Sequence, residues 1–384
     1  TPDDVFENWI APKIQELKNA RLANPNQTHA VITIPVVVHV IHDGDAYGTG
    51  ENIHDNQVLS QIQVLNQDFR RMIGTPGYNN NAVGADVEIE FCMAQTDPNG
   101  NPTNGINRVN LGQASWTMTQ VNSNVKPSTQ WNPNEYLNMW SVRFGGGDAG
   151  ILGYAQFPDA SGLPGLNATG GAANTDGVVM AFSAFGSSDI YPAGTYSAPY
   201  DKGRTTTHEV GHWLNLDHTW GGNNNPGNTT SCSTDDNVQD TPNCIGVTAC
   251  LLNSNTCDSD NNYWGFNIRD NVENYMDYSY DDCMTMFTLG QKDRMLGFLN
   301  TVRASLLTSP GCGNTSTEEL AESSIRLYPN PTRDKIQIES AYLDPLRVEI
   351  TDISGKIWMQ LDREKTMDIG ALPLGVYLIK AVFE

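Results

Sequence analysis

Three histidines in one short segment constrain this chain more than any other feature of its sequence. Only seven histidines occur in 384 residues, and three of them lie within eleven residues. The segment is His208-Glu209-Val210-Gly211-His212-Trp213-Leu214-Asn215-Leu216-Asp217-His218. Helical residues four apart share a face, so His208 and His212 can bind one Zn²⁺ at ~2.0–2.1 Å. Glu209 is next to His208 and is placed to accept a proton from water without binding the metal.

The third histidine requires the helix to end between His212 and His218. If the helix continued, His218 would be carried past the metal, so the chain has to turn sharply near Asn215. Asparagine is the non-glycine residue that best tolerates the left-handed backbone of such a turn. Three imidazole ligands leave one position for water or substrate, which predicts a catalytic rather than a structural zinc site.

A methionine motif supports the same interpretation. The segment Asn274-Tyr275-Met276-Asp277-Tyr278 follows His218 in the sequence. A methionine in a tight turn beneath the zinc ligands is the signature of metzincin proteases. The alternative is that Met276 is an ordinary core methionine in a loop.

The composition excludes several other classes. The chain has 44 Asp and Glu against 22 Lys and Arg, for a net charge of −22. Nucleic acids and anionic membranes attract basic surfaces, so we expect neither as a partner. No run of 18 apolar residues is present, so no membrane span is expected. With 39% hydrophobic residues the chain can still form a full core.

The cysteines indicate an oxidising compartment. Seven occur, at 92, 232, 244, 250, 257, 283 and 312, and none forms a Cys-x-x-Cys pair. Disulfides are therefore favoured over a cysteine-type zinc site. An odd number leaves one thiol unpaired, and we assign it to Cys92, which follows a strand-like segment. The alternative is a set of buried free cysteines in a cytosolic protein.

Hydrophobic periodicity divides the chain into three parts. Residues 1–30 are predicted to form a helical segment, a candidate remnant of a pro-segment. Residues 31–312 follow, with strands predicted at 31–41, 87–91, 136–142 and 177–182 and a helix at 56–71. A polar linker is placed at 310–322. From 318 to 384 short alternating segments predict five or six strands, typical of a small β-sandwich.

The motifs together resemble the pappalysin family of metzincin metalloendopeptidases, most closely its small bacterial, ulilysin-like members. The resemblance covers roughly 31–309 and includes His208–Trp213, Asp235–Pro242, Asn274–Tyr278 and Asp282–Thr288. It implies an α+β zinc-protease domain with a mixed sheet and an active-site helix. Residues 318–384 resemble the type IX secretion sorting domain, an all-β immunoglobulin-like sandwich, through Leu327-Tyr328-Pro329-Asn330-Pro331 and Leu374-Gly375-Val376-Tyr377. A secreted or cell-surface enzyme, exported through the periplasm by the type IX machinery, is implied.

The resemblance also implies roles for individual residues. Tyr278 is expected to stabilise the oxyanion of the reaction, although a packing role in the turn is the alternative. Asp282 is expected at the bottom of the primed-side pocket, where it would select Arg or Lys after the scissile bond. Gly153 and Tyr154 are expected on an edge strand to which an extended substrate adds.

Two further sets of residues are assigned by the same resemblance. Disulfides are implied between Cys232 and Cys257 and between Cys250 and Cys283. A calcium loop is implied at Asp236, Asp240 and Thr241, within a segment where ten acids from 235 to 282 face a single base, Arg269. A solvated acidic face is the alternative to calcium.

Two other functions remain open from the sequence. The first is a non-catalytic zinc-containing binding protein or adhesin, which the presence of Glu209 disfavours. The second is an inactive zymogen. Residues 1–30 contain no cysteine that could cap the zinc, but latency through a carboxylate stays open. The natural substrate is a protein or peptide that the sequence does not specify.

Overall fold

The computed structural model divides into two compact units, Thr1–Gly313 and Asn314–Glu384. It describes residues 2–24, 30–156, 173–221, 232, 234–246, 248–258 and 261–312, and 325–383 apart from 331, 341–344, 353–355, 374 and 376. The predicted linker beyond Cys312, and the motif residues Pro331, Leu374 and Val376, therefore lie outside the described residues. Each unit is considered by itself.

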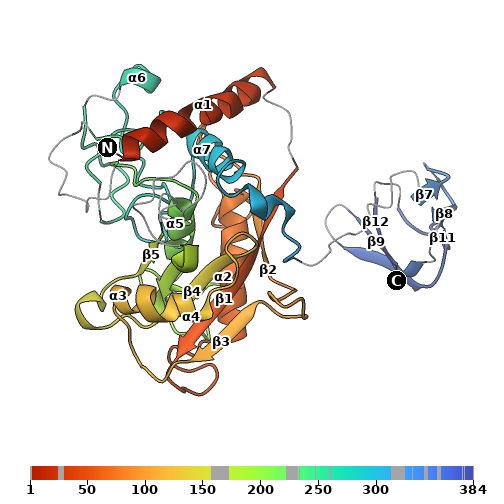
Figure 1. The fold of residues 1–384 in the computed structure, drawn as a ribbon. Coiled ribbons are helices and arrows are strands. Elements are labelled where there is room, and N and C mark those ends of the chain that lie inside the picture. The colour runs from red at the N-terminus through yellow and green to blue at the C-terminus, as the bar shows by residue number, and fades with distance from the viewer. Residues whose placement is uncertain are drawn as a thin grey trace. The chain divides into compact units, whose positions relative to one another are not determined.

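A mixed sheet forms the centre of the N-terminal unit (Figure 1). Its strands run in the order β2-β1-β4-β6-β5, and β3 also pairs with β1. All neighbours are parallel except β5, which lies antiparallel to β6 at the edge. The bounds are β1 Ile32–His42, β2 Ile89–Met93, β3 Ile106–Asn110, β4 Leu137–Val142, β5 Gly153–Ala155 and β6 Val178–Ala181.

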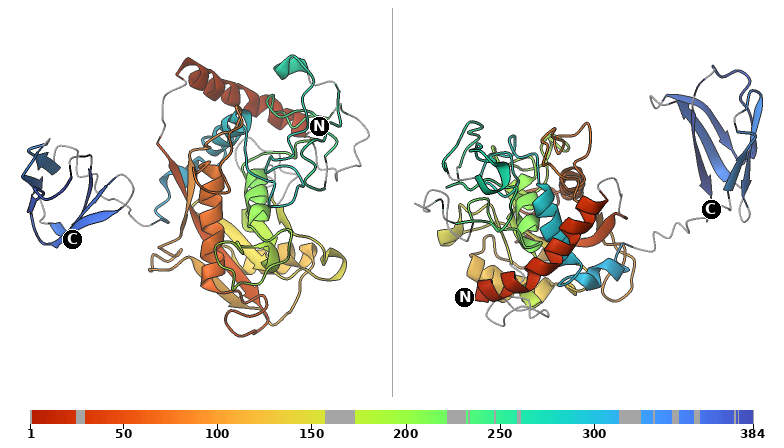
Figure 2. Two further views of the ribbon diagram at one scale, coloured as in Figure 1. Left: turned by 180° about the vertical axis from the view of Figure 1, so that it is seen from behind. Right: turned by 90° about the horizontal axis from the view of Figure 1, so that it is seen from above.

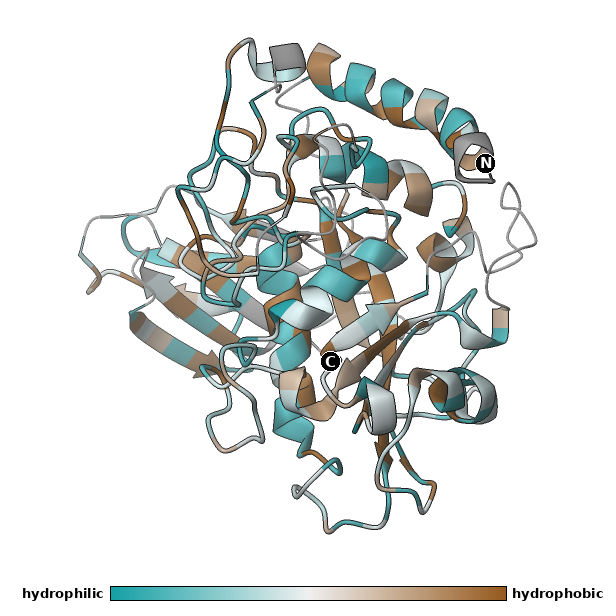
Figure 3. Cartoon of the chain, turned by 90° about the vertical axis from the view of Figure 1, so that its left-hand side faces the viewer, coloured by the Kyte–Doolittle hydropathy of each residue, from teal (hydrophilic) through white to brown (hydrophobic). Residues whose placement is uncertain are grey.

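The sheet is covered on both faces, which explains the nearly continuous apolar run of β1. Val36 and Val38 point into the main core, which also contains residues of α2 (Asp55–Phe69), α5 (Arg204–Trp213) and α7 (Leu289–Leu299). Val37 and Ile41 belong to smaller clusters with aromatic residues. In Figure 3 these strands are brown over most of their length, whereas the solvent-facing sides of the helices are teal.

Helices α2 and α7 each begin at a residue whose side chain caps the helix. Helix α2 begins after His54, whose Nδ1 accepts a hydrogen bond of 3.0 Å from the backbone of Asn56. Helix α7 begins with a capping box between Thr288 and Gln291. The shorter helices are α3 Met118–Gln120, η1 Val121–Val125, α4 Lys126–Thr129, η2 Gly146–Asp148, η4 Ala173–Thr175, η5 Phe182–Ala184, α6 Asn261–Trp264 and η6 Ala304–Thr308.

The N-terminal helix α1 (Pro2–Ala23) packs along α7, as Figures 1 and 2 both show. Its apolar side places Phe6 and Ile10 against Phe298 and Val302. Ion pairs join Arg21 to Asp293 and Glu7 to Arg294. The helix is therefore an integral layer of this unit.

The C-terminal unit consists of two three-stranded antiparallel sheets, β10-β9-β12 and β11-β8-β7. Residues of both sheets, among them Ile336 and Val348, share one small core. The strands are β7 Ile325–Tyr328, β8 Lys335–Ser340, β9 Pro345–Asp352, β10 Ile357–Asp362, β11 Thr366–Asp368 and β12 Tyr377–Phe383. The predicted fold class, a mixed protease-type unit followed by a small all-β unit, is confirmed. No helix among the described residues is long and apolar enough to cross a membrane.

Candidate metal and active site

Helix α5 carries the two histidines that were predicted to share a face. The helix begins after Gly203, which has a φ of 84°, and its residues are buried. The Nε2 atoms of His208 and His212 lie 3.0 Å apart. The Nε2 atom of His218, from the segment after the helix, lies 3.1 Å from that of His212. Three ring nitrogens therefore converge on one point.

The turn that brings His218 back is built around Asn215. This residue has a φ of 74°, in the left-handed region that the sequence led us to expect. The backbone N–H of Leu216 donates to the carbonyl of Gly211 at 3.0 Å, and that of Asn215 to His212 at 2.9 Å. This pair of bonds defines a Schellman motif with asparagine in the position usually taken by glycine.

The protonation of the rings shows that the cluster fits a zinc ion. Nδ1 of His208 donates to the carbonyl of Tyr275, and Nδ1 of His212 to that of Leu216, each at 2.7 Å. Burial lowers the pKa of His208 to about 4 and that of His212 well below its usual value, so both rings are neutral. The lone pairs of the Nε2 atoms consequently face one another, an arrangement that a shared cation stabilises. Ligands ~3.3 Å apart are expected for tetrahedral zinc at ~2.0–2.1 Å.

Glu209 lies beside the histidines and against β5. Its side chain is buried, and burial raises its pKa to about 8. A Cβ at Gly153 would lie only 3.0 Å from Oε1 of Glu209, so glycine leaves room for this carboxylate next to the edge strand. A carboxylate that accepts protons readily suits the role of a general base.

Tyr278 and Met276 occupy the other side of the cluster. The ring of Tyr278 lies 4.8 Å from that of His218 and 5.5 Å from that of His208, measured between ring centres. Burial raises the pKa of its hydroxyl to about 12, so Tyr278 is a hydrogen-bond donor at neutral pH. Met276 is fully buried beneath the helix in the main core.

A cavity of about 540 Å³ adjoins this cluster. Gly153 lines it, whereas the side chain of Tyr154 is directed to the opposite face of the sheet. The hydroxyl of Tyr154 donates to Asn122 Oδ1 at 2.9 Å. Only the backbone of Tyr154 therefore remains as a candidate for substrate binding. The lining is Met118, Gly150, Ile151, Leu152, Gly153, Tyr200, Thr205, His208, Glu209, Thr248, Asp277, Tyr278, Ser279, Asp281 and Met284.

Three acidic residues line the cavity, Glu209, Asp277 and Asp281, and Asp282, which was expected at the bottom of the primed-side pocket, is not among them. Asp282 is exposed and does not line the cavity. Asp281 is buried, and its Oδ2 accepts hydrogen bonds from the backbone N–H groups of Lys202 at 2.8 Å and Arg204 at 3.2 Å. These two hydrogen bonds from the start of α5 hold the carboxylate of Asp281, rather than that of Asp282, in the buried position. Two neighbouring acids cannot be distinguished by a spacing argument alone.

Three disulfides are present among the described residues. Two join Cys232 to Cys257 and Cys250 to Cys283. The third joins Cys92 to Cys312, so the assignment of Cys92 as the unpaired thiol is wrong. The free cysteine is Cys244, which is buried. Cys92 and Cys312 are 220 residues apart and meet only because the chain returns to β2 after η6.

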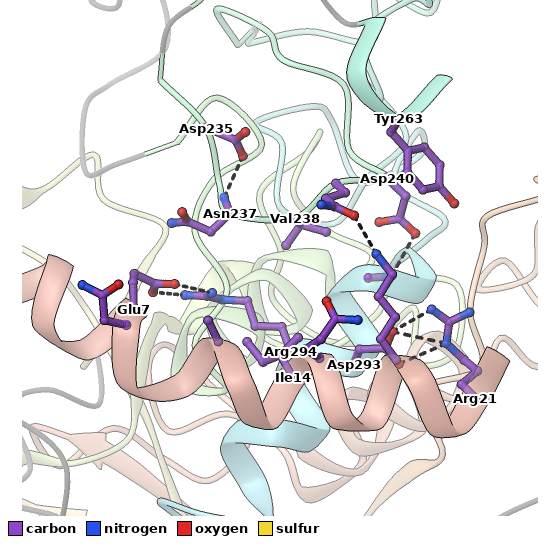
Figure 4. A pocket seen from close by; sticks show the side chains of 16 residues that line it. Glu7, Ile14, Arg21, Asp235, Asn237, Val238, Asp240, Tyr263, Asp293 and Arg294 are labelled. Carbon is purple, nitrogen blue, oxygen red and sulfur yellow. Dashed lines mark hydrogen bonds and ion pairs between the residues drawn. The ribbon is translucent and has the colours of Figure 1, made fainter. Parts of the chain in front are cut away.

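Asp240, one of the predicted calcium-loop residues, lies in a pocket beside α1 and next to the start of α7 (Figure 4). Asp240 accepts hydrogen bonds from the Thr288 hydroxyl at 2.7 Å and from the Gly290 backbone at 2.9 Å, so it caps α7. The Thr241 hydroxyl donates to Asp236. Asp236 is buried, and desolvation together with the nearby carboxylate of Asp235 raises its pKa well above the usual value.

Comparison with known proteins identifies the relatives of this chain. The model of the peptidase M43 family, described as pregnancy-associated plasma protein-A, matches residues 119–300. An extracellular metalloprotease of Colletotrichum graminicola is 31% identical over 308 residues, which cover 79% of this chain and 91% of that protein. An extracellular metalloprotease of Arthroderma benhamiae is 31% identical over 285 residues, covering 73% and 77%.

Solved structures agree with the sequence comparisons. Mature mirolysin of Tannerella forsythia, in complex with a cleaved peptide, is 39% identical, with a TM-score of 0.60 over 73% of this chain and 97% of that one. A promirolysin mutant from the same organism is 37% identical, with a TM-score of 0.59 over 77% and 91%. The chain belongs to peptidase family M43.

The M43 chain is thus a secreted zinc metalloprotease, and the alternative of a non-catalytic adhesin is not supported. A model described as a secretion system C-terminal sorting domain matches residues 326–383. This second match assigns the C-terminal unit to export by the type IX system.

Several residues that hold the M43 site together were not identified from the sequence. Buried Arg294 donates to the carbonyl of Asn215 at 2.6 Å and pairs with Glu7 of α1. Buried Arg204 pairs with Asp68 of α2 at 3.2 Å. Arg303 pairs with Asp176 at 2.6 Å. Isolated arginines carry no spacing signal, and their partners lie far away in the sequence.

Proposed function

We propose that this protease cleaves peptide bonds on the N-terminal side of arginine or lysine. The observation that carries the proposal is Asp281, a buried carboxylate in the wall of the cavity beside the zinc ligands. Both of its backbone hydrogen bonds go to Oδ2, which leaves Oδ1 for a guanidinium or ammonium group. Charge-assisted bonds of this kind are about twice as strong as neutral ones.

Neutral side chains would be disfavoured in such a pocket. A cationic residue after the scissile bond would neutralise the Asp281 carboxylate, whereas an apolar residue would leave it desolvated and unpaired. Unpaired buried groups cost a binding site about 1–3 kcal/mol, and more when they are charged. The guanidinium of Arg204, which lies near Asp281, already forms an ion pair with Asp68.

The residues around the cavity supply the remaining parts of the reaction. Zinc, when bound by His208, His212 and His218, would acidify a water molecule and polarise the peptide carbonyl. Glu209 would accept the proton of the attacking water and deliver it to the leaving amine. Tyr278 would donate a hydrogen bond to the oxyanion. Strand β5 would pair with the extended substrate through the backbone of Gly153.

A peptide library tests the specificity, with two adjacent acids as variant and control. Asp281→Asn removes the buried charge and should reduce kcat/KM for substrates with Arg or Lys after the scissile bond by about 10²–10³-fold, against little change for apolar substrates. Asp282→Asn removes an exposed charge one residue away and should leave the profile unchanged. A wild-type profile with apolar preference, or equal effects of the two variants, contradicts the proposal.

We also propose a structural calcium ion at Asp236, Asp240 and Thr241. Burial of Asp236 beside Asp235 and Asp217 concentrates negative charge that a divalent cation would compensate. The test is calcium titration of Asp236→Asn against the wild type. An identical number of bound ions in the two proteins contradicts this assignment.

A further inference from the structure

A second acidic cluster lies in the loop between β1 and α2. The side chains of Asp43, Asp45 and Glu51 offer carboxylate oxygens that all lie within 4.8 Å of one another. The loop follows the carboxyl end of β1, where the parallel strand β4 also ends. None of these residues belongs to the zinc site or to the 236–241 loop.

Glu51 provides the observation that distinguishes this cluster from an ordinary acidic surface. Only 2% of the residue is exposed. Arg143 contacts it through Nε at 3.2 Å and through its terminal nitrogen at 2.7 Å, and both contacts use Oε2. The other oxygen, Oε1, is buried and has no hydrogen-bond partner. A buried carboxylate oxygen without a partner costs stability unless a cation or donor is bound there.

The charges and distances of the cluster match a divalent cation. Three carboxylates against the single guanidinium of Arg143 leave two negative charges uncompensated. Calcium binds oxygens at about 2.3–2.6 Å, so two of its ligands are at most about 4.6–5.2 Å apart. The observed limit of 4.8 Å lies within that range. An all-oxygen ligand set favours such a hard cation over zinc or copper.

The backbone of the loop allows the three carboxylates to approach. Gly50 has a φ of 54°, and a Cβ there would collide with Oδ2 of Asp45. The Nδ2 group of Asn52 donates to the carbonyl of Asp45 at 2.8 Å, and its Oδ1 accepts from Arg108 at 2.6 Å. The loop is therefore fixed by contacts outside the cluster, before any ion binds.

We propose that Asp43, Asp45 and Glu51 form a calcium site that is separate from the catalytic zinc and from the 236–241 loop. The ion would complete the coordination of Glu51 Oε1 and fix the start of α2. That helix in turn holds α5 through Asp68, which accepts a hydrogen bond of 2.7 Å from Thr207 and pairs with Arg204. Calcium at this loop would thus stabilise the fold without contacting the substrate.

Calorimetric titration of Ca²⁺ into the zinc-loaded full chain tests the proposal. Asp43→Asn is the principal variant because Asp43 is exposed, so its replacement creates no cavity in the core. We expect this variant to lose one ion per chain or to bind it at least tenfold more weakly. Glu51→Gln should behave in the same way, whereas Glu364→Gln, an exposed change of equal charge in the C-terminal unit, should match the wild type.

Thermal unfolding gives a second readout that is independent of catalysis. Saturating Ca²⁺ should raise the midpoint of the wild type by about 2–5 °C. Asp43→Asn should lose part of this increase. Asp236→Asn, which alters the 236–241 loop, should keep that part. Equal calcium stoichiometry and an equal midpoint increase in Asp43→Asn and the wild type would overturn the proposal.

Discussion

The sulfur of Met276 packs directly against Gly211, in the middle of the zinc helix. A Cβ at position 211 would overlap Met276 Sδ and lie 3.5 Å from the ring of Phe287. Gly211 is flanked by Val210 and His212 on α5, so its lack of a side chain sets how closely the methionine turn approaches the helix. This close approach also allows the carbonyl of Tyr275 to accept the hydrogen bond from His208.

Gly211→Ala should therefore disturb the metal site as well as the core. Overpacking of this kind usually costs about 1–3 kcal/mol, although alanine is the better helix former. We expect a lower unfolding midpoint and weaker zinc binding, measured by competition with a chelator. Gly147→Ala is the matched control, because a Cβ there would meet no atom within 4 Å. Equal zinc affinity in both variants would contradict the packing argument.

Asn215 offers a test of backbone conformation. Glycine at this position should keep zinc affinity and stability within about 0.5 kcal/mol of the wild type, since a φ of 74° suits it. Asn215→Val should cost about 1–2 kcal/mol or more, because a β-branched residue disfavours the left-handed region. Chemical denaturation of both zinc-loaded variants measures the difference. If the valine variant were as stable as the glycine variant, the left-handed backbone at position 215 would not determine stability.

Arg294 links the N-terminal helix to the turn after the zinc helix. Its guanidinium, 2% exposed, joins Glu7 to the carbonyl of Asn215, as Figure 4 shows for the Glu7 pair. Arg294→Met should lower the free energy of unfolding by about 2–4 kcal/mol and weaken zinc binding. Lys18→Met, which removes an exposed bond of α1 to Gln239, should change neither quantity. An unaltered zinc affinity in Arg294→Met would show that α1 acts on stability alone.

The pKa of Asp281 predicts how the preference for Arg depends on pH. Burial raises its pKa from 3.8 to about 6. The folded chain therefore holds this proton more tightly than the unfolded chain, and the group's contribution to stability decreases as pH rises from about 4 to 6. The cation-binding form exists above pH 6, so preference for Arg should fall as pH drops through 6. Ratios of kcat/KM for paired Arg and norleucine peptides measure this, with Asp281→Asn expected to give a flat ratio.

Glu209→Gln should separate metal binding from turnover. The amide keeps the shape of the side chain but cannot accept the proton, so kcat should fall by about 10²–10⁴-fold. Zinc content, measured by elemental analysis, should stay at one ion per chain, since the three histidines hold it. Activity that survives in this variant would refute the role of Glu209 as the base.

The zinc segment could be predicted because its chemistry is local. His208, His212 and the turn at Asn215 depend on helix periodicity and on one residue's tolerance of positive φ, and both can be read from eleven residues. Strand β1 and helix α2 were predicted for the same reason. Helix α7 and strand β3 were missed, since their apolar residues are interrupted by polar ones that pair with distant parts of the fold.

What could not be predicted depends on long-range packing. The choice between Asp281 and Asp282 is made by the start of α5, almost 80 residues earlier in the chain. The partner of Cys92 is 220 residues away. The family resemblance predicted an acidic residue in this segment, and the contacts of the folded chain determine which of the two neighbouring carboxylates is buried at the cavity.

The Cys92–Cys312 disulfide fastens the last residues of the N-terminal unit to its second strand. The end of the N-terminal unit at Cys312 is therefore covalently attached to β2. In the chain-entropy description, a loop of this size is worth about 5 kcal/mol. This covalent constraint lies entirely within the N-terminal unit, so it does not depend on the C-terminal sorting unit.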